Sequence, residues 1–229
     1  MRAVIIARGW LNEPEHAKNM LSPTDLLIAA DGGAEHFRAL DLWPHILVGD
    51  LDSITAPTLA TLETAGVEIQ RYDPRKDYTD LELALRLAQE RGASQVLVFG
   101  AVGSRWDQTI ASLLLPAADD LRGLDVRLLD GYQELRLLHG AERLELQGRP
   151  GDTVSLIPLS AAALGITTHG LEYPLTDEGL LLGSTRGVSN VLLEAQATIS
   201  LRQGLLLCVI QHAGSAPSSD TDADAQISS

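Results

Sequence analysis

The sequence predicts an α/β protein with an N-terminal Rossmann-like domain, built on a parallel sheet, and a C-terminal all-β sandwich. Over the first 130 residues, short apolar runs alternate with helix-like segments, which is typical of strand–helix–strand units around a parallel sheet. After residue 130, short strand-like runs follow one another between turns rich in glycine and proline, as in an antiparallel sandwich. We expect an α/β domain at 1–130, a β-sandwich domain at 131–212 and a disordered tail at 213–229, because the tail is small, polar and acidic.

Strands and helices alternate in the first part. Its apolar runs predict strands at Val4–Ala7, Leu26–Ala30, Ile46–Val48, Val67–Arg71, Gln95–Gly100 and Val126–Leu129. Helices are expected between them, at Pro14–Leu21, Gly33–Leu40, Ala56–Ala65, Thr79–Arg91 and Trp106–Leu121. The clearest helix starts at Thr79, because Thr79 and Glu82 have the spacing of a capping box and Gly92 follows the apolar stripe.

The second part contains strand-like runs only. They lie at Leu135–His139, Arg143–Leu146, Thr153–Pro158, Ala163–Thr168, Gly179–Leu182, Val191–Ala195, Thr198–Leu201 and Leu205–Ile210. The single cysteine, Cys208, falls in the last run, so a disulfide within the chain is impossible. We expect Cys208 to be a small core residue.

Composition narrows the class of protein. A chain of 229 residues with 45% hydrophobic and 21% charged residues has the composition of a globular protein. The formal net charge of -14 argues against a nucleic-acid partner, because phosphate binding needs a basic surface. The apolar N-terminal run is too short for a signal peptide, and no run approaches the roughly 20 residues of a membrane helix. We therefore expect a cytoplasmic protein without a membrane partner.

Aspartates follow several predicted strands at the point where each strand ends. Asp31 follows the second strand, Asp50 and Asp52 follow the third, and Asp77 and Asp80 flank the start of a helix. Ligands of parallel sheets bind at the carboxyl ends of the strands, and carboxylates gathered there repel one another unless a cation lies between them. Hard oxygen ligands select Mg²⁺, usually shared with substrate phosphates. Taken singly, each aspartate could simply cap a turn or complement a helix dipole.

Other residues near these strand ends are suited to phosphate. Lys76, one of only two lysines, stands beside the carboxylates and could hold a polyphosphate together with the metal. Gly32 and Gly33 would let a backbone approach a ligand closely, and Arg105 can clamp a phosphate with two hydrogen bonds. Neither a Walker-type motif nor a Gly-x-Gly-x-x-Gly fingerprint is present. The pattern indicates a metal–nucleotide enzyme other than an ordinary P-loop kinase.

Two loops of the second part carry hydroxyl, amide and aromatic groups, at residues 167–175 and 184–190. Such groups suit a small polar heterocycle. Ordinary turn chemistry explains them equally well, and the residues alone favour that simpler explanation.

Together, these motifs resemble the thiamine pyrophosphokinase (thiamine diphosphokinase) family. The family patterns Asp-Gly-Gly-Ala, Gly-Asp-x-Asp-Ser, Asp-x-Thr-Asp and Gly-x-Arg-x-Asp-His correspond to residues 31–34, 49–53, 77–80 and 103–108. Thr-x-Gly-Leu-x-Tyr/Trp-Pro-Leu and Ser-Asn correspond to 168–175 and 189–190, in the family order. The family's Asp-His-Thr-x-x-Asn corresponds to residues 107–112 and departs at two positions, with Gln108 for histidine and Ser112 for asparagine. Gln108 cannot take up a proton near neutral pH.

The resemblance implies transfer of a pyrophosphoryl group from ATP to the hydroxyethyl oxygen of thiamine, with release of AMP. It also implies Mg²⁺ and a homodimer that binds thiamine between its subunits. The residues that would act on metal and phosphates are Asp31, Asp50, Asp52, Asp77 and Asp80, of which Asp50, Asp52 and Asp80 would hold the metal. Arg105 and Asp107 would contact the nucleotide, while Tyr173, Ser189 and Asn190 would hold thiamine. Asp80 is the candidate to accept the hydroxyl proton.

Two hypotheses from other classes remain. A haloacid-dehalogenase-type phosphatase would use Asp50 as its nucleophile, but the Asp-x-Asp motif of that class ends the first strand, whereas Asp50 follows the third. A non-catalytic sensor would bind thiamine diphosphate or a nucleotide. The carboxylate set argues against a sensor, because a binding protein has little use for so much metal-holding charge.

Overall fold

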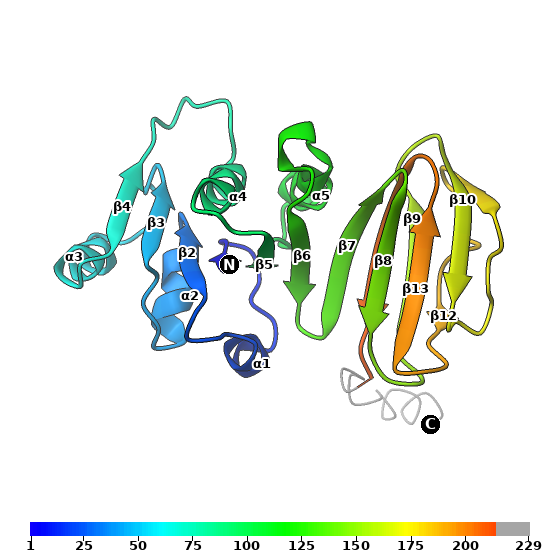
Figure 1. The fold of residues 1–229 in the computed structure, drawn as a ribbon. Coiled ribbons are helices and arrows are strands. Elements are labelled where there is room, and N and C mark those ends of the chain that lie inside the picture. The colour runs from blue at the N-terminus through cyan, green and yellow to red at the C-terminus, as the bar shows by residue number, and fades with distance from the viewer. Residues whose placement is uncertain (214–229) are drawn as a thin grey trace, which may run out of the picture.

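The computed structural model describes residues 1–213, so the predicted tail lies, beyond its first residue, outside the described residues (Figure 1). Its first part contains a parallel sheet. The strands are β1 (Arg2–Ile6), β2 (Leu26–Ala30), β3 (Ile46–Gly49), β4 (Glu68–Arg71), β5 (Gln95–Phe99) and β6 (Asp125–Asp130). They pair in parallel in the order β4-β3-β2-β1-β5-β6. The predicted strands of this part are therefore present, with ends shifted by one or two residues.

Helices cover both faces of this sheet because its strands are apolar on both sides. The helices α1 (Pro14–Asn19), α2 (Gly33–Ala39) and α3 (Ala56–Thr64) pack on one face, and α4 (Asp80–Glu90) and α5 (Trp106–Leu114) pack on the other. Figure 1 shows α4 and α5 together on one side of the strands and α1 and α2 on the opposite side. Thr79 caps α4 as predicted, since its hydroxyl accepts a hydrogen bond from the Glu82 amide at 3.2 Å.

The predicted helix Trp106–Leu121 is wrong in its second half. The α-helix α5 ends at Leu114, and two 3₁₀ turns follow at Leu115–Ala117 and Asp119–Leu121. Pro116 interrupts the helix because proline lacks the amide hydrogen that would bond the carbonyl four residues earlier, and the chain leaves the helical conformation at Ala118, which has a ψ of 137°.

The second part extends the same sheet and adds another. The strands β7 (Gln133–His139), β9 (Thr153–Pro158), β12 (Asn190–Val191) and β14 (Leu205–Gln211) continue the large sheet beyond β6 in antiparallel pairing, in the order β6-β7-β14-β9-β12. The strands β8 (Glu142–Gln147), β10 (Ala162–His169), β11 (Glu178–Leu181) and β13 (Gln196–Leu201) form a separate four-stranded sheet. The fold is thus mixed α/β with one large sheet and one separate sheet.

The predicted strand Val191–Ala195 is mostly wrong, because only Asn190 and Val191 pair with β9. The amide of Leu192 donates instead to the Asp152 carbonyl at 2.8 Å, and the amide of Leu193 donates to the Gly170 carbonyl at 2.9 Å. The amide of Leu193 is thereby directed to a loop and is not available for pairing with β9 in a longer strand.

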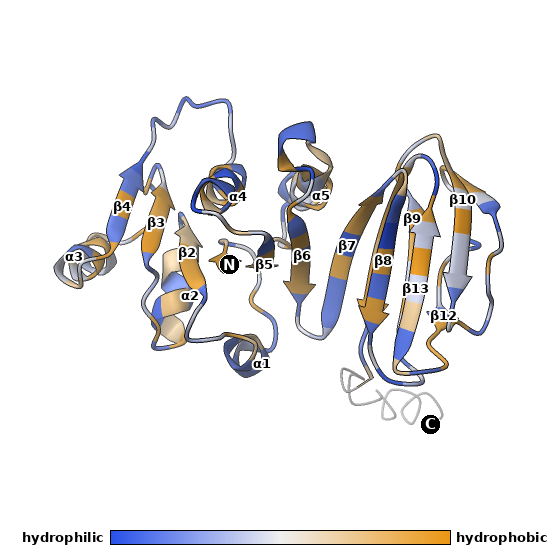
Figure 2. Cartoon of the chain, viewed as in Figure 1, coloured by the Kyte–Doolittle hydropathy of each residue, from blue (hydrophilic) through white to orange (hydrophobic). Residues whose placement is uncertain are grey.

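A second core lies between the two sheets of this part. Alternate residues of β9 and β13 are buried, and Figure 2 shows β13 with orange bands separated by pale ones. Cys208 of β14 is a buried residue of this core, as predicted, and burial raises the pKa of its thiol to about 12. Within residues 1–213, no helix is long and apolar enough to cross a membrane.

Candidate active site

The order of the parallel strands places a cavity at their carboxyl ends. The chain builds β1 to β4 in one direction and then returns to add β5 and β6 on the other side of β1. Ligand crevices form where the strand order reverses in this way. A cavity of about 730 Å³ is lined there by the residues that directly follow four strands, namely Ala7 and Arg8 after β1, Asp31 after β2, Asp50 after β3 and Gly100 after β5.

Three carboxylates converge in this cavity. Oxygen atoms of Asp31, Asp50 and Asp80 all lie within 4.8 Å of one another. Lys76, from the loop between β4 and α4, places its Nζ 2.8 Å from Asp80 Oδ1 and 3.6 Å from Asp50 Oδ2. Asp31 Oδ1 is buried and has no hydrogen-bond partner among the described residues. A buried carboxylate oxygen without a partner is expected where a cation belongs.

Unusual backbone conformations hold the carboxylates in place. Asp31 has a φ of 44° and Leu51 a φ of 68°, both in the left-handed region that non-glycine residues rarely adopt. Gly49 has a φ of 150°, and a Cβ at this position would lie 3.0 Å from Asp31 Cβ and 3.1 Å from Asp80 Oδ1. Gly49 therefore gives the two carboxylates the room to converge. Backbone strain of this kind is concentrated at functional sites.

The charges of the cluster act on one another. Burial raises the pKa of Asp80, and the neighbouring Asp31 and Asp50 act in the same direction, while Lys76 opposes them. Burial by itself would lower the pKa of Lys76, but the nearby Asp80 and Asp50 carboxylates outweigh it and raise that pKa. The cluster thus combines repelling carboxylates with one internal cation, and its oxygen atoms are hard ligands suited to Mg²⁺.

The other predicted aspartates lie outside the cluster. Asp52 lines the cavity but is exposed. Its amide donates a hydrogen bond to Asp50 Oδ1 at 3.3 Å, and its Oδ1 accepts one from Ser53 Oγ at 3.0 Å. In a continuing strand Asp50 and Asp52 would point to the same side of the backbone, but β3 ends at Gly49. Asp77 is exposed and does not line the cavity.

The predicted phosphate-binding residues divide in the same way. Arg105 lines the cavity, and its Nε donates to Asp107 Oδ1 at 3.2 Å, although Asp107 itself is not part of the lining. Gly32 and Gly33 are buried, and neither of them lines the cavity. Packing explains Gly33, because a Cβ there would lie 1.9 Å from the Ile6 carbonyl oxygen of β1.

Several lining residues were not predicted from the sequence. Arg8 follows β1, so the rule that selected Asp31 and Asp50 at strand ends would also have selected Arg8. Gln108 and Ser112, the two departures from the family pattern, both line the cavity from α5. The departures therefore fall within the candidate site.

The second group of predicted residues lies together elsewhere in the chain. Asn190 Oδ1 accepts a hydrogen bond from the Tyr173 amide at 3.0 Å, and Asn190 Nδ2 donates to the Tyr173 carbonyl at 2.7 Å. The Ser189 amide donates to Ser155 Oγ at 3.0 Å, and the Tyr173 side chain is 64% exposed. None of the three predicted residues lines the cavity. Figure 1 shows β12, which begins at Asn190, at the opposite end of the molecule from β3 and α4.

Comparison with known proteins identifies the family. The sequence model of the thiamin pyrophosphokinase catalytic domain matches residues 17–120, and that of the thiamin pyrophosphokinase vitamin B1 binding domain matches residues 142–206. The chain belongs to the thiamine pyrophosphokinase family. It is therefore a thiamine diphosphokinase-type enzyme, and the phosphatase and sensor hypotheses lose their support.

Named relatives agree over nearly the whole chain. Thiamine pyrophosphokinase of Bacillus subtilis (strain 168) is 29% identical over 205 residues, which are 90% of this chain and 96% of the relative. Thiamine pyrophosphokinase 1 of Arabidopsis thaliana is 28% identical over 217 residues, which are 84% of this chain and 78% of the relative. The crystal structure of the Bacillus subtilis thiamine pyrophosphokinase superposes with a TM-score of 0.81 at 26% identity and covers 93% of this chain and 100% of its own.

Proposed function

We propose that this chain transfers a pyrophosphoryl group from ATP to thiamine in a Mg²⁺-dependent reaction that yields thiamine diphosphate and AMP, in the cytoplasm. One observation carries the proposal. In a chain of this family, Asp31, Asp50 and Asp80 converge with Lys76 in a cavity at the point where the strand order reverses. Such a cluster is suited to hold a divalent cation together with a polyphosphate.

The residues of the cluster fit a magnesium ion. Asp31, Asp50 and Asp80 would hold it, because they offer carboxylate oxygens within 4.8 Å of one another and Asp31 Oδ1 has no hydrogen-bond partner in residues 1–213. Asp31 thus joins Asp50 and Asp80 in the place that the sequence assigned to Asp52. When bound, the ion would neutralise phosphate charge and draw electron density from the bond that breaks.

The remaining lining residues position and neutralise the substrates. Phosphoryl-group transfer requires little covalent work from the protein, so catalysis rests on alignment and on charge. Lys76 would add one positive charge next to the carboxylates, and Arg105 would contact the phosphates from the opposite loop. Asp80 was predicted to accept the hydroxyl proton, but its place in the cluster supports a role as a metal ligand instead. Asp52, which lines the cavity outside the cluster, is the better candidate for that proton.

The two ends of the chain would share the work, with residues 1–130 binding ATP and metal and residues 131–212 binding thiamine. Tyr173 would stack on the flat rings of the cationic vitamin. Tyr173, Ser189 and Asn190 do not line the cavity of their own chain, which supports a site that a second chain completes. The proposal therefore includes a homodimer with two shared sites. Exposed apolar side chains near Tyr173, such as Leu193, and on α5, such as Trp106, are consistent with a further contact surface.

The reaction itself is tested with the purified protein, thiamine, ATP and Mg²⁺. Chromatographic analysis should detect thiamine diphosphate and AMP in equal amounts, and neither should form when EDTA removes the metal. ADP as the only nucleotide product would mean transfer of a single phosphoryl group and would contradict the proposal.

The shared site is tested by complementation. Tyr173→Ala should raise the KM for thiamine much more than the KM for ATP, because Tyr173 would contact only the vitamin. Mixed dimers of Tyr173→Ala and Asp50→Asn subunits should regain part of the activity, since one of their two sites contains neither substitution. A lack of activity after subunit exchange has been demonstrated would place Tyr173 and Asp50 of one site on the same chain.

A further inference from the structure

Arg8 differs from the other cations of the cavity in having no carboxylate partner. Lys76 is paired with Asp50 and Asp80, and Arg105 is paired with Asp107. Arg8 lines the same cavity and is exposed, but it forms no ion pair with any residue of 1–213. Its guanidinium is therefore not held in a direct ion pair by any of the described residues.

The fold nevertheless holds Arg8 in a defined place. Its side chain passes over Gly32, where a Cβ would lie 2.8 Å from Arg8 Cδ and 2.9 Å from Arg8 Cγ. Gly32 has a φ of −57°, which any residue can adopt, so its backbone does not require glycine. The space that Arg8 occupies is what explains a glycine at this position.

The far end of Arg8 is also fixed. Its Nη1 donates a hydrogen bond to Ser53 Oγ, and the Ser53 hydroxyl donates in turn to Asp52 Oδ1. A neutral hydroxyl thus orients the guanidinium without cancelling its charge. A guanidinium has five N–H donors in a planar fork, and within the described residues only one of them has a protein partner.

We propose that Arg8 binds a phosphate group of the nucleotide. A planar fork of N–H donors matches the geometry of phosphate oxygens, and a charge without a partner binds an anion more strongly than a paired one. Carboxylates line the same cavity and would repel a polyphosphate, so an unpaired cation there would add to the neutralisation that a metal ion supplies. The inference rests on the proposed use of ATP. Gly32, which was expected to approach the ligand, instead makes room for the Arg8 side chain.

Binding of MgATP measured by titration calorimetry in the absence of thiamine tests the inference. Arg8→Ala should weaken ATP binding by about 10-fold or more, as expected for the loss of charge-assisted hydrogen bonds. Gly32→Ala should also weaken binding, because its methyl group displaces the Arg8 side chain. In the Arg8→Ala background, Gly32→Ala should have no further effect, since the two substitutions act on the same group.

Arg38→Gln is the control for net charge, because Arg38 pairs with Glu35 on the surface of α2 and does not line the cavity. Equal weakening by Arg38→Gln and Arg8→Ala, or additive effects of Arg8→Ala and Gly32→Ala, would overturn the inference. Unchanged ATP affinity in an Arg8→Ala variant would also overturn it, while formation of thiamine diphosphate by the wild type would leave the proposed function intact. Arg8-dependent ATP binding without formation of thiamine diphosphate would support the inference and contradict the proposed function. A wild-type protein that does not bind ATP would overturn both.

Discussion

Replacement of Lys76 by methionine removes the cation that, within residues 1–213, pairs with the carboxylate cluster, while keeping a side chain of similar length. The Lys76 ammonium lies 2.8 Å from Asp80 Oδ1 and 3.6 Å from Asp50 Oδ2. At an effective dielectric constant of about 20, these two attractions are about 6 and about 5 kcal/mol before desolvation is subtracted. Loss of one partner from a buried ion pair costs about 3–5 kcal/mol. The side chains of Lys76, Asp50 and Asp80 are 12%, 15% and 27% exposed, respectively, so solvent screens part of this attraction.

We therefore expect Lys76→Met to lower the free energy of unfolding of the metal-free protein by about 2–3 kcal/mol. For a protein of this size the loss corresponds to a fall in Tm of about 4–12 °C. Added Mg²⁺ should restore much of the stability, because a cation held by the same carboxylates replaces the missing charge and binds only the folded state. Differential scanning calorimetry in EDTA and in excess Mg²⁺ measures both effects.

Lys18→Met is the matched control, since it removes the other lysine of the chain. The Lys18 ammonium donates to the Leu40 carbonyl at 2.7 Å and lies outside the carboxylate cluster. Its replacement should cost no more than about 1.5 kcal/mol and should cost the same with and without Mg²⁺. The reasoning fails if Lys76→Met lowers Tm equally in EDTA and in Mg²⁺, or if the metal-free variant is as stable as the wild type.

Four further substitutions test the site and the fold. Asp50→Asn and Asp80→Asn should each lower kcat by at least about 10²-fold in a coupled AMP assay while circular dichroism stays unchanged, because metal-held charge acts mainly in the transition state; near-normal kcat would remove that residue from the site. Gly49→Ala should also lower kcat, since its Cβ would lie 3.1 Å from Asp80 Oδ1; full activity would show that the carboxylates tolerate displacement. Asp152→Asn concerns a buried carboxylate in the second part. Burial alone would raise the pKa of Asp152, but hydrogen bonds from two backbone amides and from His212 outweigh burial and lower that pKa. A lowered folded-state pKa contributes stability above the unfolded-state value of about 3.9, and that stability is lost as pH falls through the folded-state value. Urea unfolding should therefore show a loss of roughly 1.5–3 kcal/mol at pH 7 that disappears in strong acid; a loss independent of pH would mean that the charge is not involved.

The sequence by itself determined most of the local structure and part of the candidate site. Apolar runs such as Leu26–Ala30 indicated strands correctly because buried parallel strands are apolar on both faces. Thr79 was identified as a helix cap because capping depends only on residues within one turn. Asp31 and Asp50 were selected because parallel strands end at a common edge, so residues that follow different strands meet there. Asp80 was selected at the start of a helix, and the same reasoning also selected Asp52 and Asp77, which lie outside the cluster.

Tertiary structure alone decided how these residues are grouped. Leu51 adopts a left-handed conformation after β3, so Asp52 lies outside the cluster of the three carboxylates, a consequence of loop geometry that residue spacing does not encode. Arg8 came to the cavity because β1 lies between β2 and β5, and such neighbours are set by pairing between distant segments.

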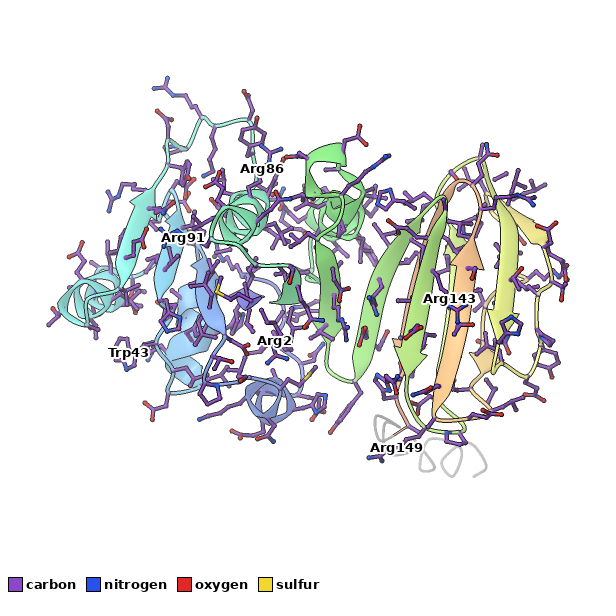
Figure 3. All side chains as sticks on the ribbon, in the orientation of Figure 1. Arg2, Trp43, Arg86, Arg91, Arg143 and Arg149 are labelled. Carbon is purple, nitrogen blue, oxygen red and sulfur yellow. The ribbon has the colours of Figure 1, made fainter. Side chains whose placement is uncertain are left out.

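Tertiary structure also decided how the two parts of the chain are joined. Leu128 of β6 pairs with Leu135 of β7, so the large sheet continues past residue 130, where the change of sequence pattern predicted a boundary. Figure 3 shows Arg86 on α4 and Arg143 on β8 far apart in this molecule. No local pattern in the sequence specifies the distance between segments such as these. Local sequence specifies the conformation of each segment, whereas strand pairing and side-chain packing between remote segments specify which segments meet.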